Sequence, residues 1–471
     1  MQLSTCNLKF QPGSFRDRSC RVFEWQGEVC RALNSESADY HRRLLQMPFF
    51  TQALERGQII DTVPAPDLTA LVQSAGYAAA VRHVRVPVLS WPWEWCFSML
   101  RDAALLQLRL MQQALAAGWI FSDASAFNIQ FIGPHPVFID TGSLVPLQPG
   151  AVWEGYRQFC QQFLYPLMLQ AWKGVDFQPW LRGRIEGIPP EQFSGLLSLR
   201  DYFRPGAFSH VWLHGLMAGR GPVQGPVRES LESSGFKAEM ILHNVRGLER
   251  IVQGMQPRFQ HSAWTSYISS EPHVQSDQPV KMSFVHATCQ AVKPSLTWDL
   301  GCNRGLYSRI AAEFGQVMAL DADQPTIDAV YRELQQEPAV ASSRILPLVQ
   351  QVADPSPNQG WRGLERAGFD SRSRPQLILA LAVVHHLVIT GGLQLADILD
   401  WLHARGADVV LEWVDPEDPL VRRLLLNRRN VFSDLRQDVF LNLLEGRFRI
   451  VQRQPLPSAS RCLYWLEPIT G

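Results

Sequence analysis

Two neighbouring stretches combine glycines and carboxylates at a spacing suited to holding a nucleoside. Residues 298–310 read WDLGCNRGLYSRI, which predicts a buried strand ending at Asp299, a tight turn containing Gly301 and Gly305, and the start of a helix. The next predicted strand, QVMALD, ends at Asp321, roughly 20 positions after Gly301. A glycine turn lets backbone N–H groups approach a ligand, and a carboxylate at this spacing can accept hydrogen bonds from ribose hydroxyls. The pattern differs from the three-glycine dinucleotide turn.

The segment DLGCNRG resembles motif I of class I methyltransferases that use S-adenosylmethionine (SAM). The resemblance implies that the turn passes beneath the adenosine and methionine parts of SAM, with Asp299 near the methionine part. Cys302 and Asn303 would lie within reach of the ligand. Asp321 would accept hydrogen bonds from the ribose, with Asp323 as the alternative for that role. Capping of the following helix is the structural explanation for the same two carboxylates.

The ends of three later strands add candidates for this site. The third strand is followed by VQQVAD, in which Gln351 or Asp354 could accept a hydrogen bond from the adenine amino group. The fourth leads into His385 and His386, where the resemblance implies that the transferred methyl meets its acceptor. A histidine with a pKa near neutral could take the acceptor's proton, and packing of one histidine against the core is the alternative. Glu412, ending the fifth strand, could orient the substrate or a histidine.

These residues need a sheet to bring them together, and the second half of the chain predicts one. Strands are expected at 296–300, 316–320, 344–349, 376–383, 408–413, 448–452 and 462–466, with helices between them, including one at 361–367. This alternation predicts an α/β domain with a mostly parallel sheet closed by an antiparallel pair. The resemblance implies a Rossmann-like, seven-stranded class I methyltransferase fold. Ligands bind outside the carboxyl ends of such strands, where the candidates fall.

The first half of the chain carries a second constellation. The stretch FSDASAFN places Asp123 and Asn128 five positions apart, and Asp140 begins an Asp-Thr-Gly triplet after a predicted strand. This pattern resembles the catalytic loop and the metal-binding triplet of the protein-kinase-like fold. The first 90 residues have no glycine-rich phosphate loop, no strand lysine of the kinase type is present, and Arg31 is the nearest cation. The resemblance therefore implies a degenerate, kinase-like α+β region; turn capping by Asp123 and Asn128 is the structural alternative.

The boundaries predicted from these patterns divide the chain into four parts. Residues 1–95 are expected to form a kinase-like small lobe, 96–268 a kinase-like helical lobe, 269–281 a polar linker and 282–471 the methyltransferase domain. A length of 471 residues favours two or three domains, and 46% apolar residues supply enough material for packed cores.

Composition narrows the partners and the compartment. The 44 basic and 44 acidic residues cancel, so neither nucleic acid nor an anionic membrane is an expected partner. The eight cysteines include no C-x-x-C pair, so no metal and no disulfide framework are expected. The N-terminus has no apolar core of signal-peptide length, and the longest apolar run is too short to span a bilayer, which predicts a cytoplasmic protein.

The function favoured by the sequence is SAM-dependent methyl transfer to an unidentified acceptor. The HHL ending of the fourth strand, the DLGxNxG turn and the upstream FxDASxxN segment together resemble a nodulation-protein-like methyltransferase group. The kinase-like region would then aid recognition of a substrate or partner. One alternative is a phosphotransferase that uses Asp123, Asn128 and Asp140, with the C-terminal domain sensing SAM. A non-catalytic interaction protein that keeps both folds is another.

Overall fold

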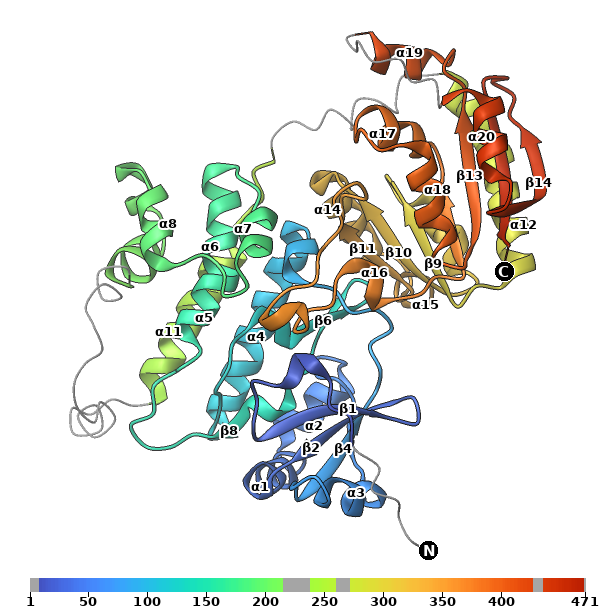
Figure 1. Ribbon diagram of the computed structural model, residues 1–471. Helices are drawn as coiled ribbons and strands as arrows, with labels where there is room; N and C mark the ends of the chain where they lie inside the picture. Colours follow the sequence, from blue (N-terminus) through green and yellow to red (C-terminus); the bar gives the residue numbers. More distant parts are fainter. Residues whose placement is uncertain (1–7, 215–237, 260–271, 427–434, 470–471) are drawn as a thin grey trace, which may run out of the picture.

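The computed structural model describes residues 8–214, 238–259, 272–426 and 435–469. Figure 1 shows three parts: a small sheet near the N-terminus, a helical lobe, and an α/β half that ends at the C-terminus. One hydrophobic core cluster continues from the helical lobe into the α/β half. The two halves of the chain are therefore packed together as one body.

The small sheet has four antiparallel strands in the order β1-β2-β4-β3. Its strands are β1 (Cys20–Trp25), β2 (Glu28–Leu33), β3 (Thr62–Pro64) and β4 (Ala79–His83), accompanied by α1 (Ser35–Leu44), α2 (Pro48–Glu55) and α3 (Thr69–Gln73). Gln26 and Gly27 both have positive φ angles, at 51° and 83°, and this conformation closes the tight hairpin between β1 and β2. Arg31 lies on β2, where it is buried.

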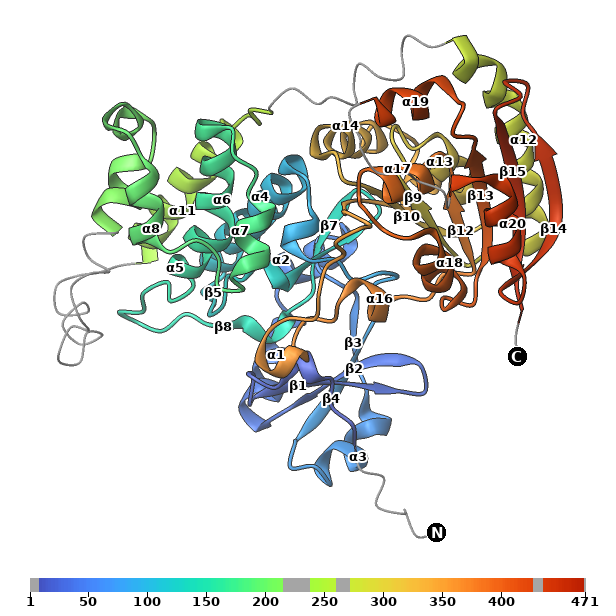
Figure 2. The ribbon, with the colours of Figure 1, turned by 45° about the horizontal axis from the view of Figure 1, so that its top comes forward.

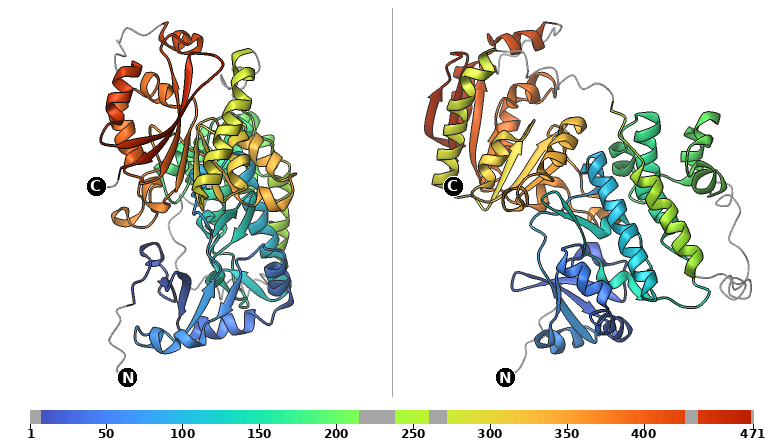
Figure 3. Two further views of the ribbon diagram at one scale, coloured as in Figure 1. Left: turned by 90° about the vertical axis from the view of Figure 1, so that its right-hand side faces the viewer. Right: turned by 180° about the vertical axis from the view of Figure 1, so that it is seen from behind.

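The helical lobe is organised around α4 (Phe97–Ala116), whose apolar residues recur around most of the helix and are buried. Two short strand pairs follow it, β5 (Trp119–Phe121) with β8 (Leu144–Pro146) and β6 (Ile129–Ile132) with β7 (His135–Phe138). The remaining helices include α5 (Tyr156–Phe159), α6 (Tyr165–Met168), α7 (Gln178–Gly183), α8 (Pro190–Leu196) and α11 (Ala238–Gln253). Figures 1 and 3 show α11 running alongside α4.

The α/β half contains a seven-stranded sheet in the order β11-β10-β9-β12-β13-β15-β14. Its strands are β9 (Leu296–Leu300), β10 (Gln316–Asp321), β11 (Ile345–Val349), β12 (Leu377–Ala380), β13 (Asp408–Val414), β14 (Phe448–Pro455) and β15 (Arg461–Pro468). The first five strands in this order are parallel, β15 pairs antiparallel with β13, and β14 pairs antiparallel with β15. The chain connections reverse direction between β9 and β12, which creates a crevice at their carboxyl ends.

Helices cover both faces of this sheet. Figure 3 (left) shows α12 (Pro272–Val292, yellow) on the face opposite α18 (Leu395–His403) and α20 (Gln437–Leu444). α13 (Leu306–Ala312) packs on α12, and α17 (Val384–Ile389) packs on α18. α14 (Gln324–Leu334) lies between the sheet and α4, while α15 (Ala339–Ser342), α16 (Phe369–Arg372) and α19 (Pro419–Leu425) are short.

Three local predictions are corrected by the structure. α12 begins at Pro272, so most of the segment 269–281, predicted as a linker, is the first part of a helix, and residues 269–271 lie outside the described residues. Packing of Phe284 and Val285 in the core outweighs the polar composition of its first turns. The helix predicted at 361–367 is only a short 3-10 turn at Trp361–Gly363. The fourth strand ends at Ala380, not at 383.

Polar contacts as well as apolar packing join α4 to α14. The backbone N–H of Ser98 donates to Asp328 Oδ1 at 2.8 Å, and the Tyr331 hydroxyl donates to Asp102 Oδ2 at 2.9 Å. Both hydrogen bonds cross from the first half of the chain to the second. They hold α14 against the helical lobe. Because α14 directly follows β10, they also hold the turn between β10 and α14.

A second joint is made by residues 350–376, called here the crossover segment, which connects β11 to β12. Figure 2 shows this segment, in orange, reaching down to the small N-terminal sheet. Arg372 and Glu94 form an ion pair in which both side chains are 1% exposed. The Trp91 indole N–H donates to the carbonyl of Ala367 at 2.8 Å. Arg16 of the N-terminal region pairs with Glu365 of the same segment.

No helix within the described residues is long and apolar enough to cross a membrane. Those residues also contain no group of three or more His, Cys, Asp or Glu side chains arranged to hold a metal ion.

Candidate functional site

A cavity of about 900 Å³ opens at the carboxyl ends of β9, β10, β12 and β13. Its volume is near the upper end of the range for ligand sites, so it can hold more than one small molecule. The lining residues fall between 278 and 461 and come from the sheet, from α12 and α13, and from the crossover segment. Most of the residues proposed from the sequence line this cavity, which lies at the point where the sheet connections reverse.

The glycine turn forms the floor of one end of this cavity. Gly301, Asn303 and Gly305 have φ angles of 69°, 48° and 68°, a left-handed conformation that glycine adopts freely and asparagine tolerates. The Cys302 N–H donates to the carbonyl of Leu320 at 2.9 Å, which ties the turn to the next strand. Gly301, Cys302 and Asn303 line the cavity, and Gly305 begins α13 behind them.

The two carboxylates at the end of β10 and just after it have different surroundings. Asp321 lines the cavity, where its Oδ2 accepts the Asn303 N–H at 3.0 Å and its Oδ1 accepts the Asp323 N–H at 2.9 Å. Asp323 instead caps α14 by accepting from the Thr326 N–H at 3.1 Å and the Thr326 hydroxyl at 2.5 Å. Carboxylate oxygens can accept more than one hydrogen bond each, so Asp321 keeps capacity for a ligand. Of the two carboxylates that the sequence offered for the ribose, Asp321 is the one that lines the cavity.

Asp299 is a buried acid at the same end of the cavity. It is 1% exposed and accepts the Ser308 hydroxyl at 2.5 Å. Burial raises its pKa to about 7, the Ser308 hydrogen bond opposes that shift, and the nearby Asp321 adds to it. A cationic group entering the cavity would favour the ionised form of Asp299. Burial also raises the pKa of the Cys302 thiol, so this side chain stays protonated.

Only one of the two candidates after β11 faces the cavity. Gln351 is exposed and lines it. Asp354 is turned toward the helical lobe, where its two carboxylate oxygens each lie 2.9 Å from the Arg182 guanidinium of α7. The expectation that Asp354 could contact adenine therefore does not match its position, because a cation from the first half of the chain holds it.

The two histidines lie on α17 and not at a strand end. After β12 the chain turns at Ala382, whose φ of 51° is unusual for alanine and marks local strain beside the cavity. His385 and His386 follow in the first turn of α17, line the cavity, and have ring centroids 4.3 Å apart. Burial lowers the pKa of His386 to about 4 and that of His385 well below its ordinary value. Neither histidine therefore has the near-neutral pKa considered from the sequence, because both rings are desolvated.

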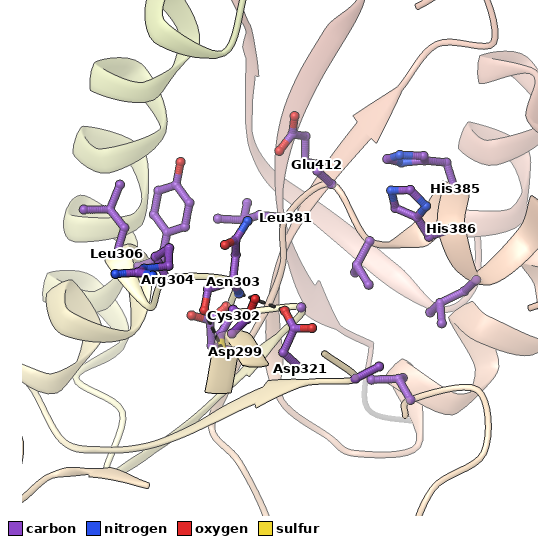
Figure 4. A pocket seen from close by; sticks show the side chains of 18 of the residues that line it. Asp299, Cys302, Asn303, Arg304, Leu306, Asp321, Leu381, His385, His386 and Glu412 are labelled. Carbon is purple, nitrogen blue, oxygen red and sulfur yellow. Dashed lines mark hydrogen bonds between the residues drawn. The ribbon is translucent and has the colours of Figure 1, made fainter. Parts of the chain in front are cut away.

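Glu412 belongs to a buried network of charges at the other end of the cavity. It is fully buried, and its Oε1 accepts from Lys281 Nζ at 2.7 Å and from Arg461 Nη1 at 3.2 Å. Arg461 also pairs with Asp418 through two contacts, of 2.9 and 3.2 Å. Figure 4 shows Glu412, His385 and His386 across the cavity from Asp299 and Asp321.

Three residues that line the cavity near Glu412 were not predicted from the sequence. Lys281 sits in the segment predicted as a linker, Arg461 lies at the start of a late strand, and Tyr307 follows the glycine turn; all three line the cavity. The pairs Lys281–Glu412 and Arg461–Glu412 join residues far apart in the chain, so no local spacing could reveal them. The only available signal was that Lys281 is the one lysine in the polar stretch 269–281.

The constellation in the first half of the chain also comes together in space. Burial and the neighbouring Asp140 raise the pKa of Asp123, whereas the Ser125 N–H and the Asn128 side chain lower it. Arg31 of β2 forms an ion pair with Asp140. The Arg366 guanidinium, from the crossover segment, lies 4.2 Å from the ring centroid of Phe127. Cations from the small sheet and from the α/β half thus pack against this cluster.

Comparisons with known proteins find a relative that is similar in sequence along nearly all of this chain. No protein-family model matches it. The nodulation protein NoeA of Rhizobium meliloti (strain 1021) is 33% identical over 466 residues, which cover 97% of this chain and 95% of NoeA.

Solved structures resemble it only distantly. The N-methyltransferase NodS from Bradyrhizobium japonicum WM9, in complex with S-adenosyl-L-homocysteine, is 13% identical, covers 45% of this chain and 94% of NodS, and has a TM-score of 0.31. The magnesium protoporphyrin IX methyltransferase ChlM from Synechocystis PCC 6803, with the same molecule bound, is 11% identical, covers 45% and 90%, and has a TM-score of 0.30. WbdD is 18% identical, covers 44% and 43%, and has a TM-score of 0.30. Scores at this level assign no activity to the chain.

Proposed function

The chain belongs to the family of the nodulation protein NoeA, and we propose that it is a methyltransferase that takes its methyl group from SAM. The observation that carries this proposal is the junction of the glycine turn and Asp321 at one cavity. A left-handed turn exposes backbone next to a carboxylate on the adjacent strand, at the crevice where the sheet connections reverse. This combination suits a nucleoside with two free ribose hydroxyls.

The residues of this chain fit the parts of SAM in order along the cavity. Asp321 would accept hydrogen bonds from the ribose, and Gln351 from the adenine amino group. The backbone of Gly301 would lie against the ligand, with Cys302 and Asn303 beside it. Asp299 would face the cationic methionine part, where a positive charge stabilises its ionised form. When bound, SAM supplies an electrophilic methyl group, and the chain contributes mainly by holding the acceptor in line with it.

The far end of the cavity would receive the methyl acceptor. His385 and His386 are held neutral by burial, and a neutral imidazole has a nitrogen that can accept a proton. We assign the proton-accepting role to this histidine pair. Glu412 is fixed by two cations and would orient the acceptor through its remaining oxygen.

The first half of the chain would act as a scaffold with a degenerate kinase-like fold. Two observations support this part of the proposal: Asp123, Asn128 and Asp140 converge, and Arg31 pairs with the Asp140 carboxylate that a metal ion would otherwise need. The same half holds the crossover segment through Trp91 and Glu94. Its contribution to recognition would therefore be indirect, because it supports the cavity wall that carries Gln351.

The test is titration calorimetry of the full chain with SAM. Asp321→Ala should weaken SAM binding about 10- to 100-fold, because two charge-assisted hydrogen bonds to the ribose are lost. Asp354→Ala is the matched control, since it removes a neighbouring carboxylate that is paired with Arg182. Its affinity should equal that of the wild type. Mg-ATP should give no binding heat.

Two results would contradict the proposal. SAM could give no heat with the wild-type chain, or Asp321→Ala could bind SAM as tightly as the wild type does. Binding of Mg-ATP that depends on Asp140 would favour the phosphotransferase alternative.

A further inference from the structure

The acceptor end of the cavity has a wall that is polar, buried and already charge-balanced. This acceptor wall consists of Lys281, Tyr307, Glu412 and Arg461, with His385 beside it. Lys281 and Arg461 have side chains that are 8% and 7% exposed, and Glu412 is fully buried. A buried ion network costs desolvation free energy, so its position next to a ligand cavity points to a role in recognition.

The charges of the network argue for an uncharged acceptor. Lys281 and Arg461 carry two positive charges, and Glu412 and Asp418 carry two negative charges. The ion pairs Lys281–Glu412, Glu412–Arg461 and Arg461–Asp418 link these four groups in a row. An anionic acceptor would approach cations whose partners are already in place and would meet Glu412. A cationic acceptor would find the carboxylates already paired and would meet the like charges of Lys281 and Arg461.

The hydrogen-bonding capacity of the wall argues for hydroxyl groups. The Lys281 ammonium has three N–H groups and a single hydrogen-bond partner, Glu412, among the described residues. The hydroxyl of the half-buried Tyr307 has no partner there. Glu412 Oε2 and His385 Nδ1 are likewise buried without one in the described chain. Donors and acceptors are therefore presented together, and a hydroxyl satisfies both because it can donate and accept.

An apolar acceptor would fit this wall poorly. It would leave the buried ammonium, carboxylate oxygen and imidazole unpaired, which is the situation that most strongly rejects a ligand lacking polar groups. The cavity is also large enough for a nucleoside and a second molecule of similar size. Acceptors with several neighbouring hydroxyls match both its volume and its chemistry.

We propose, building on SAM-dependent methyl transfer, that the acceptor is an uncharged molecule with several hydroxyl groups, such as a sugar, and that it is methylated on oxygen. A carbon–oxygen bond forms as the carbon–sulfur bond of the sulfonium breaks, and the electron pair of that bond stays on sulfur. The hydroxyl proton passes to the neutral imidazole of His385 and then to solvent. Lys281 and Tyr307 position the hydroxyls.

The experiment offers the full chain, with labelled SAM, three sets of acceptors of similar size. These are neutral methyl glycosides and short neutral oligosaccharides, sugar acids and aromatic carboxylates, and primary amines including amino sugars. Formation of S-adenosylhomocysteine and of a methylated product is followed by mass spectrometry. Transfer to oxygen of the neutral set, at least tenfold faster than to either charged set, is expected.

Variants then test the wall itself. Tyr307→Phe removes one hydroxyl and should raise KM for the neutral acceptor about tenfold, with kcat changed less and the Kd for SAM within twofold of wild type. Tyr40→Phe is the control, because it removes an exposed tyrosine hydroxyl on α1. Lys281→Met should have a larger effect on KM. Arg449→Met, on the exposed face of β14, is its control.

The outcomes distinguish the identity of the acceptor from the proposed use of SAM. If the wild-type chain binds SAM but transfers methyl only to carboxylates or amines, or to none of the three sets, the acceptor assignment is overturned and the cofactor assignment stands. If Tyr307→Phe and Lys281→Met both leave the KM for a neutral acceptor unchanged, the wall is not the acceptor subsite. If the wild-type chain fails to bind SAM, the proposed function itself fails.

Discussion

Two regions present carboxylates at or just after the ends of short strands: the ends of β9 and β10, and the region around Asp123 and Asp140. In the first region, Asp321 accepts only backbone N–H groups among the described residues and lines a cavity of about 900 Å³. In the second, Arg31 pairs with Asp140, and Arg366 packs on the neighbouring Phe127. The same kind of sequence pattern thus leads to an open site in one half of the chain and to a cluster packed against cations in the other.

The difference shows what a motif does and does not determine. A strand followed by an acid fixes where the carboxylate sits, because the strand direction and the turn are local properties. Whether that carboxylate meets a ligand or an arginine depends on elements from distant parts of the chain. Residues 31, 140 and 366 lie in three separate segments, so their meeting is a property of the whole fold.

The largest effect is expected at the joint between the two regions. Arg372→Met leaves Glu94 as a buried carboxylate without its ion partner, and should lower the free energy of unfolding by about 3–5 kcal/mol. Arg436→Met, which breaks the exposed pair with Asp438, should change the free energy of unfolding far less. Urea unfolding of both variants measures the difference. Equal costs would mean that the crossover segment is not held by the first half of the chain.

A strong effect on binding is expected at the glycine turn. Gly301→Arg should weaken SAM binding by about 100-fold or more, since a side chain there enters the cavity and the φ of 69° adds strain. Gly118→Arg is the control, because its φ of 77° imposes similar strain and its surroundings are open. Calorimetry should show normal SAM binding for this second variant. A similar loss in both would trace the effect to folding instead of the site.

A smaller, pH-dependent effect is expected at Asp299. Its pKa of about 7 lies above the ordinary value near 4, so the folded chain keeps a proton that the unfolded chain releases. The contribution of Asp299 to the stability of the wild type therefore falls as pH rises from about 4 to about 7. Asp299→Asn removes this titration, so its Tm relative to the wild type should be at least about 2 °C higher at pH 8 than at pH 5.

Thermal melts without ligand at the two pH values test this, and a pH-independent difference would contradict the buried acid. Asp140→Asn provides the comparison from the other region. It should lose stability, because the buried Arg31 loses its partner.

The smallest effects on methyl transfer are expected from Asp123 and Asp140 in the first half of the chain. Asp123→Asn and Asp140→Asn should leave the Kd for SAM within about twofold of wild type, since neither side chain lines the cavity. Calorimetry and acceptor turnover measure this directly. A tenfold loss of turnover in Asp123→Asn with normal SAM binding would show that the first half of the chain takes part in the reaction.

The sequence allowed the sheet and one end of the site to be predicted because both depend on local signals. Apolar runs of strand length located all seven strands to within a few residues, and the glycine spacing placed Gly301 and Asp321 together. Asp321 and Asp323 could not be separated, because helix capping by Asp323 is decided by the angle at which the chain enters α14.

The acceptor end could not be predicted, because long-range pairing creates it. Lys281, Glu412 and Arg461 come from a helix and two strands, and no periodicity links them. His385 was placed near the site, but the early end of β12 put it on a helix. Asp354 was one of two alternatives for the contact with adenine, and it instead meets Arg182, a residue of the other half of the chain.

The anchoring of the crossover segment has a consequence for any attempt to divide the molecule. Gln351 and its neighbours are attached at one end to β11 and at the other to contacts with Trp91 and Glu94. A fragment beginning at α12 would retain every lining residue and still lose the support behind the adenine side. The two halves therefore depend on each other, and a substitution buried in the first half can alter which ligands the cavity in the second half binds.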